Sequence, residues 1–315
     1  MRLKFIAVAC ALMMVKNMPA QVTYPYPVHH FSLSVEDKNI QMAYMDIRPS
    51  TANGQTVILF HGKNFNGYYW KDIIPSLTEK GYRVIVPDQV GWGRSDKPEL
   101  HYSFHMLASN SRSLLDSLQV GKVIVIGHSM GGMLAVRFAL LFADRTEKLV
   151  LENPIGLEDY RTFVPYKTLQ ETYHKERAAS YDSYKKYQQS YYPVWRPEYE
   201  QYVQAQAESL ADPAFDRIAR VNAVTYQMIY EQPVVYEFAR LACPVLLIIG
   251  QADRTVVGKN LLTGEQKKNY GQYPQLGRKA KAQIKNCRLV ELAGVGHIPH
   301  VQDTAAFKKA LFSFL

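Results

Sequence analysis

Short apolar runs alternate with stretches of helical spacing over much of the chain. The runs Thr56 to Phe60, Arg83 to Val86 and Val123 to Ile126 are each followed by turn residues and predict buried strands. Between them, apolar residues recur every three or four positions over Tyr69 to Lys80 and His105 to Leu118, which predicts helices. Alternation of strand and helix is typical of a parallel sheet with helices on both faces.

The two ends of the chain extend this pattern. His29 to Val35 and Ile40 to Ile47 flank a polar turn and predict a hairpin. Later elements are expected as strands at Lys148 to Leu151, Pro244 to Ile249 and Arg288 to Leu292, and as a helix from Thr304 to Phe314. The predicted fold class is α/β, with one mostly parallel sheet flanked by helices.

Residues 153–242 depart from the alternation. This stretch holds 13 of the 22 tyrosines, and its periodicity predicts helices over Glu198 to Leu210 and Phe215 to Tyr230. We interpret it as a helical cap inserted into a core made of residues 21–152 and 243–315. The tyrosines either line a pocket for a ring-bearing substrate or fix the cap to the core and cover its surface.

The N-terminus has the order of a secretory signal. Basic residues precede an apolar run from Phe5 to Val15, and Lys16 to Ala20 follows. Eleven apolar residues are too few to span a bilayer. We therefore expect residues 1–20 to be a signal peptide and the protein to be exported, periplasmic or secreted, without stable membrane insertion. The alternatives are an uncleaved anchor or a buried N-terminal helix.

Composition and charge fit a globular protein. The 315 residues are 47% hydrophobic and 21% charged, enough for one large core or two modest ones. The net charge is +9, but the basic residues are scattered apart from a cluster in residues 259–285, and no nucleic-acid module accompanies them. We expect no nucleic-acid partner.

Cys243 and Cys287 each precede an apolar run, so they are expected as buried free thiols, with a disulfide between neighbouring strands as the alternative.

The candidate chemistry begins at Gly127-His128-Ser129-Met130-Gly131, between a predicted strand and a predicted helix. This context is typical of a nucleophile elbow, in which glycines permit a tight turn and the helix directs its N–H groups toward the serine. A serine hydroxyl needs a base, and the base needs an anion to orient it. Asp253 and His297 each follow a later strand end, in the chain order expected for such an elbow. We therefore predict the catalytic residues Ser129, Asp253 and His297.

Other histidines and acids compete for these roles. His128 adjoins the serine on a tight turn and is expected to point away from it. We expect His61 to brace a neighbouring loop, and His300 lacks the two glycines that precede His297 in Gly294-Val295-Gly296. Glu152 and Asp88 are the competing acids. The histidines and cysteines lack ligand spacing, so no metal site is predicted.

Acyl transfer also needs donors for the developing oxyanion. The backbone N–H of Met130 lies at the expected start of a helix. The backbone N–H of Lys63 follows Gly62, which permits close approach, and Asn64 is the reserve. These donors act through the backbone, so their side chains are not decisive.

Several of these stretches together resemble the cap-bearing α/β-hydrolases. They are His61-Gly62-Lys63, Asp88 to Asp96 (similar to D-x-x-G-x-G-x-S-D), Gly127 to Gly132, Gly250 to Asp253 and Gly296 to His300. The resemblance covers all but the leader and the cap. It implies an eight-stranded, mostly parallel sheet, a Ser-Asp-His triad and no cofactor.

The resemblance also narrows the chemistry. Relatives that open epoxides or remove halide place Asp at the elbow, so Ser129 disfavours those reactions. The expected activity is that of a serine hydrolase, cleaving an ester or similar acyl bond of a small-molecule substrate through an acyl-enzyme. A carbon–carbon bond hydrolase, a lactonase and an aminopeptidase remain alternatives with the same triad. A non-catalytic binding protein is the alternative from another class.

Overall fold

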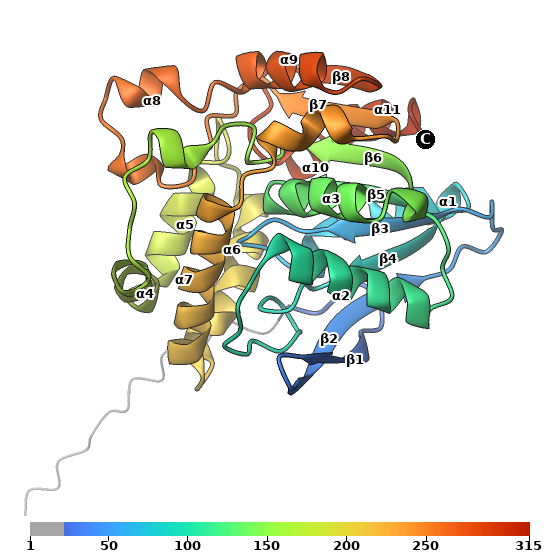
Figure 1. Cartoon of the computed structure of the whole chain (residues 1–315), viewed down its shortest axis with the longest axis horizontal. Coiled ribbons are helices and arrows are strands. Elements are labelled where there is room, and N and C mark those ends of the chain that lie inside the picture. The colour runs from blue at the N-terminus through green and yellow to red at the C-terminus, as the bar shows by residue number, and fades with distance from the viewer. Residues whose placement is uncertain (1–21) are drawn as a thin grey trace, which may run out of the picture.

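The computed structural model describes residues 22–315, so the expected signal peptide lies outside the described residues. It contains one eight-stranded sheet in the order β1-β2-β4-β3-β5-β6-β7-β8 (Figure 1). The strands are β1 His29–Val35, β2 Lys38–Ile47, β3 Thr56–Phe60, β4 Arg83–Pro87, β5 Val123–His128, β6 Thr146–Glu152, β7 Val245–Gly250 and β8 Cys287–Leu292. β1 and β2 form the predicted hairpin, β2 pairs antiparallel with β4, and every other pair is parallel. The predicted fold class is confirmed.

Helices cover both faces of the sheet and form an insertion between β6 and β7. The α-helices are α1 Ile74–Glu79, α2 Phe104–Ser117, α3 Met130–Leu141, α4 Leu169–Arg177, α5 Tyr181–Gln189, α6 Glu200–Ala207, α7 Phe215–Glu231, α8 Gln266–Asn269, α9 Tyr273–Gln283, α10 Pro299–Gln302 and α11 Thr304–Phe312. The 3₁₀ helices are η1 Gly67–Trp70, η2 Ala143–Arg145, η3 Tyr160–Thr162, η4 Pro197–Tyr199, η5 Glu208–Ala211, η6 Val235–Arg240 and η7 Lys259–Leu261.

Side chains of the central strands alternate between two hydrophobic layers. On β5, Val123 and Val125 join the layer formed with α2, α3 and α9, whereas Ile124 and Ile126 join the layer formed with α1 and α11. All six residues of β5 are buried. This burial on both faces explains why the central strands are apolar runs without alternation.

Two elements differ from the sequence prediction. The hairpin turn is shorter than expected because Glu36 and Asp37 adopt positive φ values of 48° and 59°, so β2 begins at Lys38. The helix expected over residues 69–80 is divided into η1 and α1, and Pro75 lies in the first turn of α1. Proline fits that position, since the first helical N–H groups have no intrahelical acceptor.

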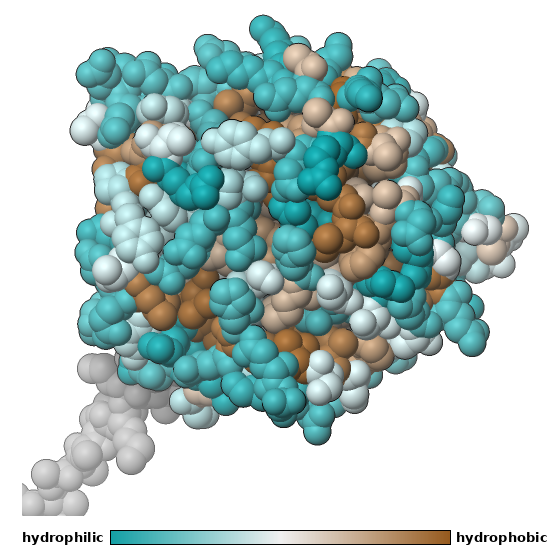
Figure 2. Space-filling model, in the orientation of Figure 1, coloured by the Kyte–Doolittle hydropathy of each residue, from teal (hydrophilic) through white to brown (hydrophobic). Residues whose placement is uncertain are grey.

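The described part of the segment predicted as the cap, residues 153–242, contains α4 to α7 and no strand. In Figure 1 these helices lie together at one end of the molecule, with α4 beside α7 and α5 beside α6. Figure 2 shows hydrophilic residues interspersed with smaller hydrophobic areas on the face in view. Within residues 22–315, no helix is both long and apolar enough to cross a membrane.

The two cysteines of the described chain, Cys243 and Cys287, are free thiols as expected, but both are half-buried, whereas the prediction had them buried. Burial raises the pKa of each thiol to about 11. The alternative, a disulfide between the two, is not formed in this structure.

Candidate active site

Ser129 occupies a strained turn between β5 and α3, with φ +56° and ψ −120°. A Cβ atom on Gly127 would lie 2.2 Å from the Gly131 carbonyl oxygen, and one on Gly131 would lie 2.2 Å from the Phe60 oxygen. No side chain fits at either position, because real Cβ contacts are never this short. The two glycines thus allow the backbone to hold Ser129 in a conformation that costs about 1–3 kcal/mol.

The structure brings the three predicted side chains together. His297, in the loop after β8, has its Nε2 atom 2.9 Å from Ser129 Oγ. Its Nδ1 atom lies 2.7 Å from Oδ2 of Asp253, in the loop after β7. All three residues are buried. If the carboxylate accepts from Nδ1–H, then Nε2 is free to accept the serine proton.

Asp253 is held as an anion by several donors. Burial raises the pKa of its carboxyl, but the adjacent His297 and hydrogen bonds from His297, Asn153 and Thr255 outweigh this effect, and the pKa is lowered. The Asn153 amide donates to Oδ2 at 2.7 Å and the Thr255 N–H donates to Oδ1 at 2.8 Å. Asn153 also accepts from the Gly250 N–H at 2.8 Å. Sequence reasoning missed Asn153, whose one signal is its position directly after β6.

A cap residue supports the loop of His297. The His297 backbone N–H donates to the Tyr191 carbonyl at 2.7 Å, and the two rings stack with centroids 4.7 Å apart. A Cβ on Gly296 would lie 2.2 Å from the same carbonyl oxygen. Glycine is therefore required where this loop meets the cap. Tyr191 was not among the predicted site residues.

A second buried chain of hydrogen bonds connects three segments around Ser129. The Gly62 N–H donates to the Tyr69 hydroxyl at 2.9 Å, and that hydroxyl lies 3.1 Å from His128 Nδ1. His128 Nε2 lies 2.8 Å from the His297 carbonyl oxygen. Because a carbonyl only accepts, Nε2 donates, and Nδ1 of the neutral ring accepts from Tyr69. Burial, with the neighbouring His297, lowers the pKa of His128 well below its ordinary value, which agrees with a neutral ring.

The competing histidines are engaged elsewhere. His61 Nδ1 lies 2.9 Å from the Gly62 oxygen, and its Nε2 accepts from the Gln89 N–H at 3.0 Å. His61 therefore braces the loop after β3, as predicted. His300 Nδ1 lies 2.9 Å from both carboxylate oxygens of Glu152, and its backbone N–H donates to Glu152 at 2.7 Å. The competing acid Glu152 is therefore paired with His300 and not with His297.

Asp88, the other competing acid, makes contacts that brace two loops and none with His297. Its carboxylate accepts from the Gly67 N–H at 2.6 Å and from the Arg94 N–H at 2.7 Å. Its backbone oxygen accepts from the Ser95 hydroxyl at 2.6 Å. Asp88 thus fixes the loop after β4 against the loop after β3.

The loop after β3 contacts the serine turn. A Cβ on Gly62 would lie 3.2 Å from Ser129 Cβ, so the two backbones are in close contact. Within residues 22–315, the backbone N–H groups of Lys63, Asn64 and Met130 have no hydrogen-bond acceptor. Met130 begins α3, where the helix directs its free N–H groups and positive dipole end. These groups are free to bind a developing oxyanion.

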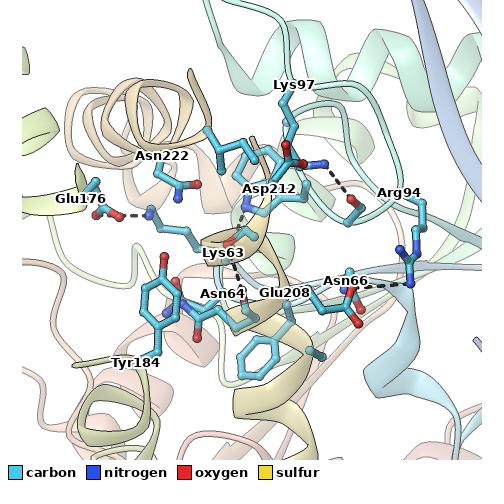
Figure 3. Close-up of a pocket in the computed structure, with 18 of the residues that line it drawn as sticks. Lys63, Asn64, Asn66, Arg94, Lys97, Glu176, Tyr184, Glu208, Asp212 and Asn222 are labelled. Atoms are coloured by element: carbon cyan, nitrogen blue, oxygen red, sulfur yellow. Dashed lines mark hydrogen bonds and ion pairs between the residues drawn. The ribbon is translucent and has the colours of Figure 1, made fainter. Parts of the chain in front are cut away.

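A pocket of about 390 Å³ lies beside this loop (Figure 3). It is lined by residues 63–66, by residues 91–94 and Lys97 after β4, and by cap residues from α4, α5 and the stretch 205–222. We call it the polar chamber. Over the described residues, no group of three or more His, Cys, Asp or Glu side chains is placed to hold a metal ion.

The sheet order and the serine turn define a hydrolase of the α/β class. Residues 55–304 match the alpha/beta hydrolase fold family over well more than half of the chain. The protein belongs to this family.

Comparison with individual proteins gives the same class. A crystal structure of a probable hydrolytic enzyme from Pseudomonas aeruginosa PAO1 superposes with a TM-score of 0.91 at 44% identity, covering 93% of this chain and 95% of that one. An esterase from Exiguobacterium antarcticum has a TM-score of 0.70 at 18% identity, covering 90% of this chain and 98% of that one, which shows the shared fold.

Among curated sequences, an uncharacterized protein of Mycobacterium tuberculosis is 35% identical over 105 residues, 33% of this chain and 30% of that protein. A haloalkane dehalogenase of Mycobacterium marinum is 30% identical over 158 residues, 46% of this chain and 52% of that enzyme. The match thus spans between about a third and a half of the length of these two relatives.

Proposed function

We propose that the protein is a serine hydrolase that cleaves an ester or similar acyl bond through an acyl-enzyme on Ser129. The observation that carries the proposal is the continuous hydrogen-bonded series from Ser129 through His297 to Asp253, with distances of 2.9 and 2.7 Å. Such a series lets a neutral imidazole remove the serine proton at neutral pH.

In the first half-reaction, Ser129 Oγ attacks the substrate carbonyl carbon while His297 Nε2 takes its proton. The carbonyl π electrons move to oxygen, and the backbone N–H groups of Met130 and Lys63 stabilise that oxyanion. Each such donor contributes about 3–4 kcal/mol in comparable sites. When the oxyanion collapses, the bond to the alcohol oxygen breaks, and His297 gives its proton to the leaving alcohol.

In the second half-reaction, water attacks the acyl-enzyme and His297 takes the water proton. Collapse of this second intermediate releases the acid and returns the proton to Ser129. Asp253 stays ionised throughout and stabilises the transient imidazolium, in keeping with its lowered pKa.

The residue at the elbow separates this chemistry from that of the dehalogenase relative. Resemblance to the halide-removing members predicts Asp at this position, and this chain carries Ser129. Carbon–carbon bond hydrolases, lactonases and aminopeptidases use the same triad and remain alternatives for the bond that is cleaved.

The test is the substitution Ser129→Ala, assayed on p-nitrophenyl acetate and butyrate. We expect kcat to fall by about 10⁴-fold or more. Ser113→Ala is the matched control, because Ser113 is exposed on α2, and it should keep the wild-type rate. A folded Ser129→Ala protein with wild-type activity would remove the serine from the mechanism.

We also propose that residues 1–20 direct export of the protein. Cell fractionation of the full chain and of a chain beginning at Gln21 tests this. Export should be lost in the shorter chain; equal distribution of the two would refute the proposal.

A further inference from the structure

We propose that the polar chamber binds a neutral, hydroxyl- or amide-bearing part of the substrate, so that the enzyme prefers polar over hydrocarbon esters. This inference rests on the proposed function and adds the chemical class of the substrate. The chamber volume of about 390 Å³ is within the range of small-molecule sites.

The chamber adjoins the surroundings of the candidate reaction centre through two residues of one loop, although Ser129 and His297 do not line it. Lys63 offers its backbone N–H to the oxyanion, whereas its side chain extends into the chamber toward Glu176 of the cap (Figure 3). Asn64 also lines the chamber, and its amide donates to the Tyr191 hydroxyl at 2.8 Å. The Tyr191 ring stacks on His297. A group bound in the chamber therefore lies beside the loop that contacts the Ser129 turn, and the proposal places the polar part of the substrate there.

The charged groups of the chamber are balanced. They are the cations Lys63, Arg94 and Lys97 and the carboxylates Glu176, Glu208 and Asp212. Four of them form two ion pairs, Lys63–Glu176 at 3.8 Å and Arg94–Glu208 at 3.5 Å. These distances exceed the 2.7–2.9 Å or so of a direct charge-assisted hydrogen bond. The third cation, Lys97, donates to the Gly93 and Ser95 carbonyls at 2.7 and 3.0 Å.

This balance disfavours two kinds of ligand. A ligand with a net charge would meet as many like charges as opposite ones. A hydrocarbon chain would displace water from six charged side chains and return no hydrogen bonds, which costs free energy. A neutral group with donors and acceptors can bind beside the Lys63–Glu176 pair and replace that water, whereas Arg94 and Glu208 are also hydrogen-bonded to the Val22 backbone.

Asn222 supplies a neutral hydrogen-bonding group at this place. It lies on α7, lines the chamber and is seen on the same side as the Lys63–Glu176 pair in Figure 3. Its side-chain amide has no hydrogen-bond partner within residues 22–315. An amide offers one acceptor and two donors, so it can bind a hydroxyl or another amide. Aromatic rings of Phe65, Trp92 and Tyr184 line other parts of the wall and suit the C–H faces of such a group.

The test compares esters that differ by one hydroxyl in place of a methyl group. One pair, 2-hydroxyethyl butyrate and propyl butyrate, varies the alcohol side. The other pair, methyl 3-hydroxybutyrate and methyl 3-methylbutyrate, varies the acyl side. We expect the hydroxyl member of at least one pair to have a kcat/KM about tenfold higher or more. Equal rates, or faster cleavage of the apolar members in both pairs, would overturn the inference.

Variants locate the preference in the chamber. Asn222→Leu keeps the side-chain volume and removes the amide, and it should reduce the hydroxyl preference about fivefold or more. Asn269→Leu, the same change at an exposed position of α8, should leave the preference unchanged. Asn222→Ser serves where the leucine variant does not fold. An unchanged preference in a folded Asn222 variant would contradict the assignment.

Two further arms separate this inference from the proposed function. Butyrylcholine and monomethyl succinate test a charged ligand, and preference for either over the hydroxyl esters would replace the neutral class. Binding of the same hydroxyl and methyl esters to the Ser129→Ala protein, followed by calorimetry, reports the chamber without catalysis. If the wild-type protein hydrolyses no ester but the Ser129→Ala protein still binds the hydroxyl esters more tightly, only the proposed hydrolase function is refuted. If the wild-type protein hydrolyses esters without a preference for the hydroxyl members, only the proposed role of the polar chamber is refuted.

Discussion

The Tyr69 hydroxyl joins Gly62, in the loop after β3, to His128 through hydrogen bonds. It accepts from the Gly62 N–H at 2.9 Å and faces His128 Nδ1 at 3.1 Å, and the ring is fully enclosed. The substitution Tyr69→Phe keeps the ring and removes this oxygen. The Gly62 N–H then loses its acceptor, and His128 Nδ1 loses its donor, in a place that water does not reach.

The structure sets the size of the effect. Each buried group left without a partner costs about 1–3 kcal/mol, so the free energy of unfolding should fall by roughly 2–6 kcal/mol. The loop can lessen this loss by moving Gly62, but Lys63 is the next residue and its N–H would then leave the oxyanion position. Removal of one oxyanion donor costs about 10²–10³ in kcat. We therefore expect lower stability together with a lower kcat and little change in KM.

Urea unfolding and steady-state kinetics on p-nitrophenyl butyrate measure both quantities. Tyr82→Phe is the control, because Tyr82 is also buried but its hydroxyl has no hydrogen bond within the described chain. Equal unfolding midpoints and equal kcat values for Tyr69→Phe and Tyr82→Phe would refute this role of the Tyr69 hydroxyl.

Three further outcomes follow from the same geometry. Asp253→Asn should lower kcat by about 10⁴-fold, because the amide cannot stabilise the imidazolium or fix its tautomer; a loss under tenfold would contradict the role of Asp253. Burial lowers the pKa of His61 and His128, so the unfolded chain binds more protons below pH 6.5. The free energy of unfolding should thus keep its full value above that pH and decrease below it by up to about 1.4 kcal/mol per pH unit for each ring. Equal urea midpoints at pH 7.5 and 5.5 would show that both rings are protonated in the folded state as well. Cys243 and Cys287, with pKa values of about 11, should react slowly with a disulfide reagent at pH 8 when folded and fully in denaturant without reductant; slow reaction in denaturant would indicate a bond.

Local patterns explain what the sequence could predict. The central strands were predictable because both of their faces are buried, which leaves an apolar run such as Val123 to Ile126. The serine turn was predictable because only glycine fits at positions 127 and 131. Asp253 and His297 followed from their places after strand ends and their order in the chain, since parallel strands place their carboxyl ends at one edge of the sheet.

The supporting residues were not predictable, because their contacts join distant parts of the chain without a local pattern. Asn153 binds Asp253 across 100 positions, and Tyr69 faces His128 across 59. Tyr191 meets His297 only because the cap returns to the sheet edge. Periodicity places each of these residues on an element and does not show which distant atom it meets. The charge balance of the polar chamber likewise depends on how α4 and η5 pack over the core.

Labelling with a fluorophosphonate probe, followed by peptide mass spectrometry, tests the central claim most directly. We expect one modified residue, Ser129, with labelling abolished in Ser129→Ala and strongly slowed in a folded His297→Ala protein. Modification of a different residue, or an active enzyme that the probe leaves unmodified and uninhibited, would contradict it.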